Sequence, residues 1–398
     1  MYLISKTLTD FEEAGLHQHF CLADGHAYQD LHPSFLNIIQ SLPQIWHKMA
    51  SQSIPSTAQM FNSSFAKLIN APVLENFNCN FKICPTASNS IDIIGAVLHV
   101  LKYSVVMIEP AFDNLALLMK RRGVDLHSVK DVDLFNAAEE NEIEYRLPHL
   151  KKYQALVLVH PNNPTGLTLS EKAFENIISF CKTHHIALII DNCFRIYRRE
   201  TYCDYKILIE SSIPFITLED TGKVWPTQDL KASLLYFSEH FKSVISEIYN
   251  EIYLCVSNFA LGVLSAFFDV TAYTGIQETI WNIVDTRREA LRNVIKHSVL
   301  SIAPHAINSK LPVEWLFCLQ DNLDDIQICN ELKSLNLAIL PGRQFYWNSS
   351  QFPFHHKNIR VSLMKPETIF TSGLQILQNY SHSLNQTTIK DRQELLQA

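Results

Sequence analysis

Short apolar runs alternate with segments of helical spacing between Cys84 and Tyr236, and this alternation restricts the possible folds more than any other feature of the sequence. Each run has the length and the β-branched or aliphatic composition of a buried strand. Strands connected by helices form a mostly parallel sheet with helices on both faces, so we predict an α/β fold. The predicted strands span residues 104–108, 155–160, 187–191 and 215–218, and the predicted helices span 91–101, 113–122 and 170–183.

After about Tyr236 the pattern changes. Residues 239–292 have mostly helical spacing, and strands return at 315–319, 338–340 and 359–363. A run of helices followed by strands is typical of a smaller α+β domain. We therefore predict an N-terminal arm that packs beside the small domain or over the functional site, a large domain, and a small C-terminal domain, at residues 1–46, 47–285 and 286–398.

Composition argues against several kinds of partner. The 398 residues carry a net charge of −7 and no dense basic run, so we expect no nucleic-acid partner. The longest apolar stretch, 254–268, contains three polar residues, so we expect no membrane span, and residues 1–25 lack the pattern of a secretory signal. Nine cysteines without metal-ligand spacing predict no metal site and reduced thiols, as in a cytoplasmic protein.

The most specific local string is Asn-Asn-Pro-Thr-Gly at 162–166, directly after a predicted strand. Its composition also suits an ordinary strand-to-helix turn, since Pro164 and Gly166 are turn formers. The string resembles the Asn-Pro-Thr-Gly motif of the class I/II aminotransferases, which are fold type I enzymes that depend on pyridoxal 5'-phosphate (PLP). In that family the asparagine donates a hydrogen bond to the O3′ oxygen of the cofactor, and Asn163 holds the matching position.

Asp191 closes the apolar strand at 187–191, where it would point into the crevice at the carboxyl end of the sheet. The competing interpretation of an acid at this point is a helix N-cap. In the family that this chain resembles, the aspartate pairs with the pyridinium nitrogen, whose proton makes the cofactor a stronger electron sink. Three residues later the family usually has a tyrosine that touches O3′; this chain has Phe194, which predicts the loss of one hydrogen bond.

Lys223 lies in the string Glu-Asp-Thr-Gly-Lys-Val-Trp-Pro-Thr at 219–227, after the last predicted strand of the sheet. A lysine in a loop is most often a solvated residue, but the spacing behind Asn163 and Asp191 matches the family's Schiff-base lysine. The resemblance implies that the Lys223 amine forms an imine with the cofactor aldehyde and is then displaced by the substrate amine. The freed amine would move the Cα proton, which makes Lys223 the catalytic residue.

The family's phosphate ligands near the lysine are altered in this chain. Family members carry a hydroxyl residue three positions before the lysine and an arginine eight positions after it, where this chain has Asp220 and Lys231. Lys231 keeps the positive charge but loses the bidentate fork. Because Asp220 would repel phosphate, we expect it to point toward Lys231 or toward the substrate. Thr221 or Thr227 would then supply the hydroxyl.

The remaining cofactor contacts come, by the same resemblance, from two other segments. Thr86, Ala87 and Ser88 precede the predicted helix 91–101, and backbone N–H groups at a helix N-terminus suit a dianion. An ordinary helix cap is the competing interpretation. Phe112 holds the place of the aromatic ring that stacks on the cofactor, with a core phenylalanine as the alternative.

Two C-terminal strings support the resemblance, which covers the chain from about Asn80 to Met364. Residues 340–345 are similar to the Pro-Gly-x-x-Phe turn of the family's small domain. Residues 359–363 are similar to the strand whose arginine binds the substrate carboxylate with both nitrogens, a role that falls to Arg360. An arginine between apolar neighbours also suits an edge position from which its head reaches water.

The string at 219–227 also resembles a subgroup of the family, the PLP-dependent arginine oxidases and hydroxylases, in which a substrate-derived carbanion reacts with O₂. The stretch Leu-Ala-Asp-Gly-His-Ala at 22–27 is similar to the N-terminal stretch of that subgroup, where a histidine approaches the substrate. His26 is the nearest match, with His32 behind it. An ordinary surface histidine is the alternative.

Three functions remain open from the sequence. The first is an aminotransferase that binds an L-amino acid through Arg360 and gives a 2-oxo acid. The second is an O₂-consuming L-arginine oxidase or hydroxylase of a natural-product pathway, in which Asp220 and either Glu12 or Glu13 pair with the guanidinium. The third is a non-catalytic PLP-fold protein that serves as a binding module. The resemblance also implies a homodimer.

Overall fold

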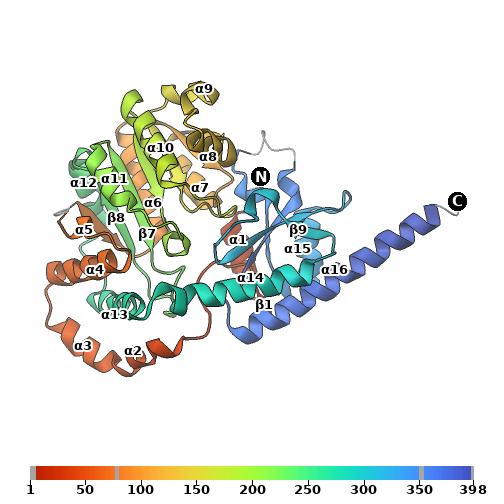
Figure 1. Cartoon of the computed structure of the whole chain (residues 1–398). Coiled ribbons are helices and arrows are strands. Elements are labelled where there is room, and N and C mark those ends of the chain that lie inside the picture. The colour runs from red at the N-terminus through yellow and green to blue at the C-terminus, as the bar shows by residue number, and fades with distance from the viewer. Residues whose placement is uncertain (1–5, 77–79, 349–353, 396–398) are drawn as a thin grey trace, which may run out of the picture.

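The computed structural model describes residues 6–76, 80–348 and 354–395, with the backbone alone described for 385–395. Each of the three predicted domains therefore includes a few residues outside this description. Figure 1 shows a large α/β body, a smaller α+β body beside it, and the N-terminal helix α1 (Leu8–Leu16) between them. The C-terminal helix extends beyond the smaller body.

In the described residues, a seven-stranded sheet forms the centre of the large body, in the order β2-β8-β7-β6-β5-β3-β4. β8 runs antiparallel to both of its neighbours, and the other neighbouring strands are parallel. The predicted α/β fold with a mostly parallel sheet is confirmed. The strands are β2 (Phe81–Cys84), β3 (Ser104–Glu109), β4 (Asp125–Lys130), β5 (Ala155–Val159), β6 (Ala187–Asp191), β7 (Phe215–Asp220) and β8 (Ser233–Phe237).

Helices cover both faces of this sheet, because parallel strands are joined by right-handed crossovers. From β2 through β3 to β4 the chain advances across the sheet toward one edge. From β4 through β5 and β6 to β7 it returns across the sheet in the opposite direction. The connections therefore put α6 and α7 on one face, with α12 beside α6, and α8, α10 and α11 on the other. The helices are α5 (Val73–Asn76), α6 (Ala87–Val100), α7 (Asp113–Arg121), α8 (Asp131–Glu139), α9 (Ile143–Arg146), α10 (Glu171–His184), α11 (Asp204–Ser211) and α12 (Lys242–Ile252).

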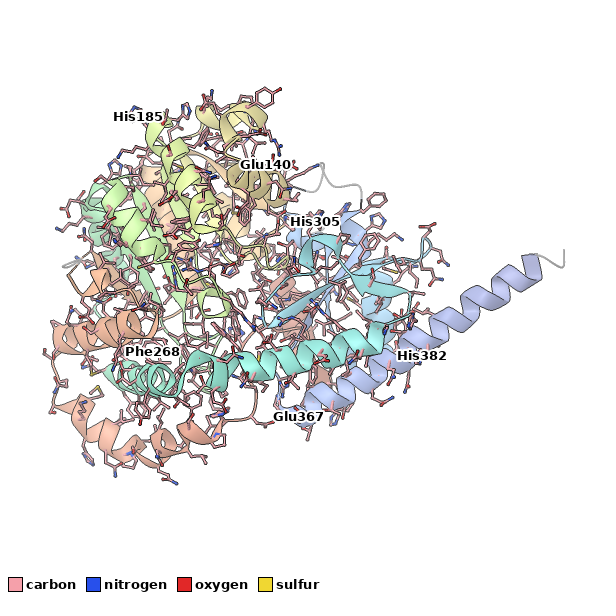
Figure 2. All side chains as sticks on the ribbon, viewed as in Figure 1. Glu140, His185, Phe268, His305, Glu367 and His382 are labelled. Carbon is pink, nitrogen blue, oxygen red and sulfur yellow. The ribbon has the colours of Figure 1, made fainter. Side chains whose placement is uncertain are left out.

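The interior of the large body is apolar on both sides of the sheet. Every residue of β5, β6 and β8 is buried, so these strands show no alternation of polar and apolar side chains. A further apolar layer forms where α4 (Ile54–Leu68) packs on α13 (Asn258–Thr274). Phe268 of α13 (Figure 2) lies in this layer with its ring centroid 5.1 Å from that of Trp225, close to Lys223 in the chain.

The smaller body is built on an antiparallel sheet in the order β12-β13-β10-β9, with β1 and β11 paired in parallel beside it. The predicted strand at 338–340 is wrong as a single element, because the chain crosses from β11 to the other sheet at Ile339. The run is apolar because β11 and β12 are both buried, each in a different sheet. The elements are β1 (Phe20–Cys21), β9 (Leu300–Ile302), β10 (Val313–Cys318), β11 (Leu337–Ala338), β12 (Leu340–Pro341), β13 (Asn358–Ser362), α14 (Asn282–Ile295), α15 (Asp325–Ser334) and α16 (Glu367–Leu395).

The predicted helical region 239–292 is interrupted twice. α12 ends at Ile252, and α13 begins after Ser257, whose side chain caps it. A π-helical turn, Gln277–Trp281, then separates α13 from α14. No single helix of the described residues is long and apolar enough to cross a membrane; α13 and the helix after it meet the length and composition test only as a pair bent by 105°.

The N-terminal arm contacts both bodies. β1 pairs with β11, and the strap that follows (residues 22–29) crosses from the small body to the large one. The carbonyl of Leu22 accepts a hydrogen bond from the backbone of Ser362. The backbone N–H of Ala27 donates to the carbonyl of Gly222, next to Lys223. α2 (Leu36–Gln40) and α3 (Leu42–Ala50) then pack on α13, so the end of the arm belongs to the large body.

Gly166 of the large body lies against Ser309 of the small body, at a contact between the two. Its φ is +72°, and an added Cβ would lie 2.9 Å from the backbone Cα of Ser309 and nearer still to that side chain. Gly123 has a similar φ of +80°, but its Cβ would meet only the side chain of His99, at 3.2 Å. We predict that Gly123→Ala lowers the free energy of unfolding by about 1 to 2 kcal/mol, because alanine is strained at positive φ. Gly166→Ala should carry the same strain and lose about 1 to 3 kcal/mol more through the clash with Ser309. Denaturant unfolding of both variants measures this difference, and equal losses would contradict it.

Candidate active site

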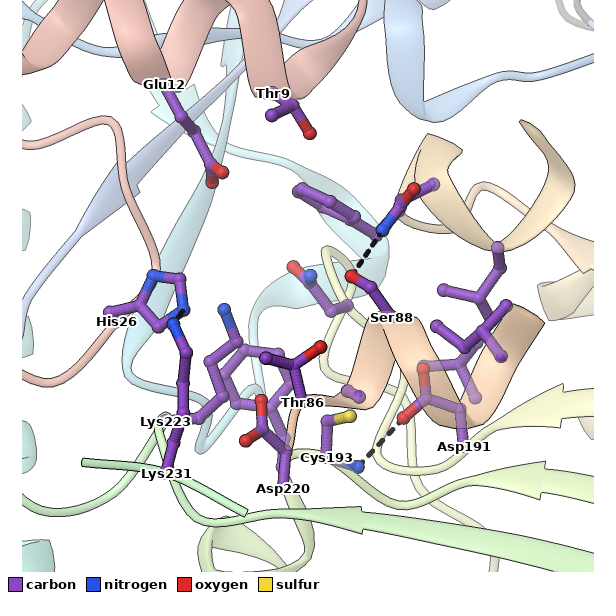
Figure 3. A pocket seen from close by; sticks show the side chains of 18 of the residues that line it. Thr9, Glu12, His26, Thr86, Ser88, Asp191, Cys193, Asp220, Lys223 and Lys231 are labelled. Atoms are coloured by element: carbon purple, nitrogen blue, oxygen red, sulfur yellow. Dashed lines mark hydrogen bonds between the residues drawn. The ribbon is translucent and has the colours of Figure 1, made fainter. Parts of the chain in front are cut away.

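A cavity of about 220 Å³ lies at the carboxyl ends of β5, β6 and β7, beneath α1 (Figure 3). Its walls come from the arm, the large body and the small body. Eleven of the residues nominated from the sequence line this cavity, so segments spread over most of the chain meet there. These residues are His26, Thr86, Ala87, Ser88, Phe112, Asn163, Asp191, Asp220, Lys223, Lys231 and Arg360.

The parallel strands set the floor of the cavity. Val159 of β5 is paired with Asp191 of β6, and Asp191 is paired with Leu218 of β7. Because parallel strands end at the same edge, the segments after them start side by side. Asn163 and Lys223 are therefore held on either side of Asp191 by backbone register.

The loop that carries Lys223 is fixed by hydrogen bonds from several elements. The hydroxyl of Tyr197 donates to the Lys223 carbonyl at 2.7 Å. The side chain of Gln29 in the strap donates to the Val224 carbonyl at 2.9 Å, and Nε1 of Trp225 donates to α13 at 2.9 Å. A fixed backbone limits the reach of the Lys223 amine to the cavity, which suits a point of covalent attachment.

Asp191 is a buried carboxylate at the back of the cavity. Its Oδ1 accepts the backbone N–H of Cys193 at 2.9 Å (Figure 3), and the helical turn that follows begins only at Arg195, so Asp191 is not its N-cap. Burial raises the pKa of Asp191, and the charge of Asp220 raises it further, while Cys193 and Lys223 act in the opposite direction. A buried carboxylate of increased basicity is a strong acceptor for a protonated ring nitrogen.

Asn163 is positioned by a buried cluster under its loop. Asn162 donates to Asp131 at 2.8 Å and to Thr165 at 3.1 Å, and the Thr165 hydroxyl donates to the same Asp131 oxygen at 2.9 Å. Oδ1 of Asn163 accepts from Arg360 at 3.4 Å. The Asn163 amide nitrogen is then the donor of this side chain, as a contact to the O3′ oxygen of a cofactor would need.

The segment nominated for phosphate differs from the prediction in one respect. α6 begins at Ala87 and not at Ile91, because Thr86 caps the helix by accepting the backbone N–H of Asn89. The first-turn N–H groups of an α-helix lack helical partners and carry a partial positive charge, so the segment from Ala87 to Ser88 suits an anion. The Ser88 hydroxyl also accepts a hydrogen bond from Asn114 at 2.8 Å (Figure 3).

Lys231 and Asp220 are charged groups that line the same cavity as that segment. Nζ of Lys231 lies 3.6 Å from Asp229 and 3.4 Å from Nε2 of His26. Asp220 faces the cavity, and its Oδ1 accepts the backbone N–H of Gly222 at 2.9 Å. Among the described ion pairs none joins Asp220 to Lys231, and Asp220 lines the cavity, as its predicted direction toward the substrate would require.

The prediction that Thr221 or Thr227 supplies a phosphate hydroxyl is wrong. Both threonines are buried outside the cavity and are already bonded to the backbone. The Thr221 hydroxyl accepts the N–H of Ala232 at 2.9 Å, and the Thr227 hydroxyl donates to the Leu230 carbonyl at 2.6 Å. These bonds shape the loop from β7 to β8, and the threonines that line the cavity are Thr9 and Thr86.

Two phenylalanine rings line the cavity. Phe112 faces it and also packs edge to face on Phe345, with ring centroids 6.0 Å apart, so its core role and its predicted stacking role are compatible. Phe194 occupies the position where the resembled family has a tyrosine. A phenyl ring donates no hydrogen bond, so Phe194 contributes only an apolar surface.

Arg360 is almost completely buried on β13, with a relative exposure of 1%, so it is not an edge residue that reaches water. One guanidinium nitrogen donates to the Ala23 carbonyl at 2.8 Å and contacts Glu12 at 3.2 Å, and Nε has no partner. Burial lowers the pKa of Arg360, and the charges of Glu12 and Asp24 oppose this effect. A buried, partly unpaired fork is prepared to bind a further carboxylate.

The arm provides the remaining polar groups of the cavity. Of the two glutamates nominated from the arm, Glu12 faces the cavity (Figure 3) and Glu13 is exposed. His26 lines the cavity, and its Nδ1 lies 2.6 Å from Asp24. His32 caps a short helical turn outside the cavity, so the structure favours His26 over it.

Sequence reasoning missed several residues of this site. Cys193 and Thr9 line the cavity, Tyr197 fixes the backbone of Lys223, and Asp24 orients His26. Cys193 was within reach of prediction, because it follows Asp191 by two residues and so lies at the same edge of the sheet. The others act through contacts between distant segments, for which the local sequence carries no signal.

The groups that line the cavity fit PLP. An amine, a buried carboxylate, an aromatic ring, and a helix N-terminus with a lysine nearby match the aldehyde, ring nitrogen, ring face and phosphate of that cofactor. Across the described residues, no three His, Cys, Asp or Glu side chains gather in a way that would hold a metal ion. Fold and cavity together define a fold type I PLP enzyme.

Comparison with known proteins places the chain in a family. A family model for aminotransferase class I and II matches residues 27–230, just over half of the chain. Aromatic-amino-acid aminotransferase 2 of Thermococcus litoralis is 32% identical over 74 residues, which are 17% of this chain and 19% of that protein. Human kynurenine–oxoglutarate transaminase 1 is 23% identical over 179 residues, 41% of this chain and 42% of that protein.

Those two matches span less than half of each relative. A longer match is the structure of MppP soaked with the product 2-ketoarginine, which has a TM-score of 0.82, 26% sequence identity, and coverage of 90% of this chain and 99% of that chain. The chain belongs to the class I and II aminotransferase family, and its cofactor is PLP. The predicted family, fold class and cofactor are therefore confirmed.

Proposed function

We propose that the protein transfers the amino group of an L-amino acid and releases the corresponding 2-oxo acid. The observation that carries this proposal is a single cavity faced by the Lys223 amine, the Asp191 carboxylate and the Arg360 guanidinium. The reaction needs an exchangeable amine, a carboxylate behind the cofactor ring and a fork for the substrate carboxylate. These side chains supply each of the three.

The cofactor would be held at four points by residues of the large body. Asn163 would donate to O3′, Asp191 would accept from the ring nitrogen, and the first turn of α6 with Lys231 would bind the phosphate. When bound, PLP supplies an aldehyde that condenses with amines and a ring that withdraws electrons from the substrate Cα. After the substrate amine replaces that of Lys223, the freed Nζ would accept the proton from Cα.

Arg360 would orient the substrate. Its guanidinium contacts Glu12 at 3.2 Å, so an incoming carboxylate competes with a carboxylate of the arm. Displacement of Glu12 would free an acidic group inside the closed cavity. α1 covers the cavity (Figure 3), so this helix would also exclude water from the reacting atoms.

We further propose that the amino acid is basic, with arginine as the first candidate. Glu12 and Asp220 both face the cavity, and both are acceptors for a cationic side chain once Arg360 is occupied by the substrate carboxylate. The similarity to MppP supports this assignment, because that structure was soaked with the product 2-ketoarginine.

Oxidation or hydroxylation of L-arginine with consumption of O₂ is a second candidate. It is favoured by Asp220, which replaces the family's phosphate-binding hydroxyl with a carboxylate in the cavity. The resemblance of residues 219–227 and 22–27 to the arginine oxidases and hydroxylases supports the same reading. Both candidates share the groups that bind the amino acid. They differ in the acceptor, which is a 2-oxo acid in the first reaction and O₂ in the second.

Two further proposals concern the setting of the enzyme. The family resemblance supports a homodimer, and the apolar side chains of Leu36, Ile39 and Trp46 on α2 and α3 are exposed and available for such an interface. A cytoplasmic location is supported by the cysteines, since all of those in the described residues are free thiols.

One experiment separates the candidates. The purified holoenzyme is incubated with L-arginine and the other amino acids, with and without a 2-oxo acid acceptor, in an oxygen electrode. We expect an acceptor-dependent appearance of 2-ketoarginine and of the aminated acceptor. Arginine-dependent O₂ uptake without an acceptor would instead establish the second candidate. If neither is seen with any amino acid, the remaining interpretation is a non-catalytic module.

A separate experiment tests whether Asp220 recognises the positive charge of the substrate side chain. Asp220→Asn keeps the bond to Gly222 but removes the charge, so we predict that kcat/KM for arginine falls about 10- to 100-fold, the value of a charge-assisted hydrogen bond. Citrulline, which is uncharged, should be affected far less. Asp269→Asn removes an exposed carboxylate that does not line the cavity and serves as the matched control. An unchanged ratio of arginine to citrulline turnover would exclude this role.

A further inference from the structure

Lys365 is a buried lysine beside the cavity that no step above uses. It is 3% exposed, follows β13 and precedes α16. Its Nζ lies 3.4 Å from Oδ2 of Asp24 and 4.6 Å from the ring centroid of Tyr28. Lysine is almost never buried unless its charge is paired, so this position indicates an electrostatic role.

Asp24 connects Lys365 to His26. Its Oδ1 accepts from the backbone N–H of His26 at 2.9 Å and lies 2.6 Å from Nδ1 of the same ring, while Oδ2 faces Lys365. Burial by itself would raise the pKa of Asp24, but the His26 bond and the charges of Lys365 and Lys223 bring the pKa well below its ordinary value. Asp24 is therefore ionised and can only accept hydrogen bonds.

The contacts of the imidazole fix its tautomer. A carboxylate at Nδ1 requires a proton on that nitrogen, because an ionised Asp24 has none to give. At Nε2, His26 meets the ammonium of Lys231 at 3.4 Å, and an ammonium can only donate. These contacts place the proton of the ring on Nδ1, and the lone pair of Nε2 faces Lys231 in the cavity.

Several charges act on this arrangement from different elements. Asp24 places a negative charge beside Nδ1 of His26, and Lys231 places a positive charge beside Nε2. Burial lowers the pKa of Lys365, while Asp24, Cys21 and Glu12 raise it. Lys365 thus places a positive charge on the far side of Asp24, where it offsets the carboxylate without touching the ring.

We propose that Lys365 is a positioning residue whose charge offsets that of Asp24, so that Asp24 orients His26 without charging the ring. Once Lys231 binds the cofactor phosphate, Nε2 of His26 would be a second proton acceptor of the cavity, in addition to Nζ of Lys223. The proposal rests on the proposed function only for the identity of the proton that Nε2 would accept.

The test measures the His26 ring directly. In holoenzyme labelled with ¹⁵N-histidine, the His26 signals are those that His26→Gln removes. In wild-type protein at pH 7.5 we expect an unprotonated Nε2 and a protonated Nδ1. In Lys365→Met, the pH at which Nε2 takes up a proton rises by about one unit, since one nearby unit charge changes such an equilibrium by about tenfold. The acidic limb of the kcat profile moves by the same amount.

Two further variants separate charge from packing. Lys357 is the matched control: it is also buried in the small body, but its Nζ donates only to backbone carbonyls, those of Gln320, Asp321 and Leu323. Lys357→Met should lower stability and leave the His26 titration unchanged. Lys365→Arg, which restores the charge, should return the titration to the wild-type pH. If Lys365→Met does not fold, Lys365→Gln provides the same measurement with a neutral donor toward Asp24.

The outcomes are distinct. A Lys365 variant that folds and titrates as the wild type overturns the proposal, as does a wild-type ring with its proton on Nε2. A shifted titration in an enzyme that converts no amino acid supports the positioning role of Lys365 and removes the proposed function instead. The two failures are therefore told apart by measurements on the same samples.

Discussion

The register of three parallel strands is the constraint on which the site depends. Val159, Asp191 and Leu218 are neighbours across β5, β6 and β7, so the segments that follow them leave the sheet together. That register brings Asn163, Asp191 and Lys223 to one cavity although 60 residues separate the first from the last. A slip of one residue in any strand would turn its side chains to the other face and separate these groups. Buried apolar residues on both faces of β5 and β6 make such a slip costly.

The cavity is completed by parts of the chain that lie far from the sheet. The small body contributes Arg360, and the arm contributes Glu12 and His26. Their charges are coupled: Glu12 contacts Arg360, and Asp24 orients His26. Binding of a substrate carboxylate by Arg360 would change the partner of Glu12. Because Glu12 belongs to α1, which lies over the cavity, binding of that carboxylate would also affect the position of α1.

Residues at the ends of parallel strands were predictable from the sequence, because order along the chain and position along the sheet edge are related by simple crossovers. Asn163, Asp191 and Lys223 belong to this class, and the motif around each of them is local. The start of α6 was placed too late because Thr86 caps it, and the strand at 338–340 proved to be two strands in different sheets. Tyr197, Asp24 and Lys365 were missed because their contacts join distant segments. Phosphate ligation by Thr221 or Thr227 failed because both threonines lie outside the cavity.

The central claim is that the amine of Lys223 holds the cofactor covalently in front of Asp191. Borohydride reduction of the purified holoenzyme, followed by proteolysis and peptide mapping, tests this claim without any assumption about the substrate. We predict a stable pyridoxyl label on the peptide that contains Lys223, and no label in Lys223→Ala. A label on another lysine, such as Lys231 or Lys365, or no label on a protein that binds PLP, would contradict the account.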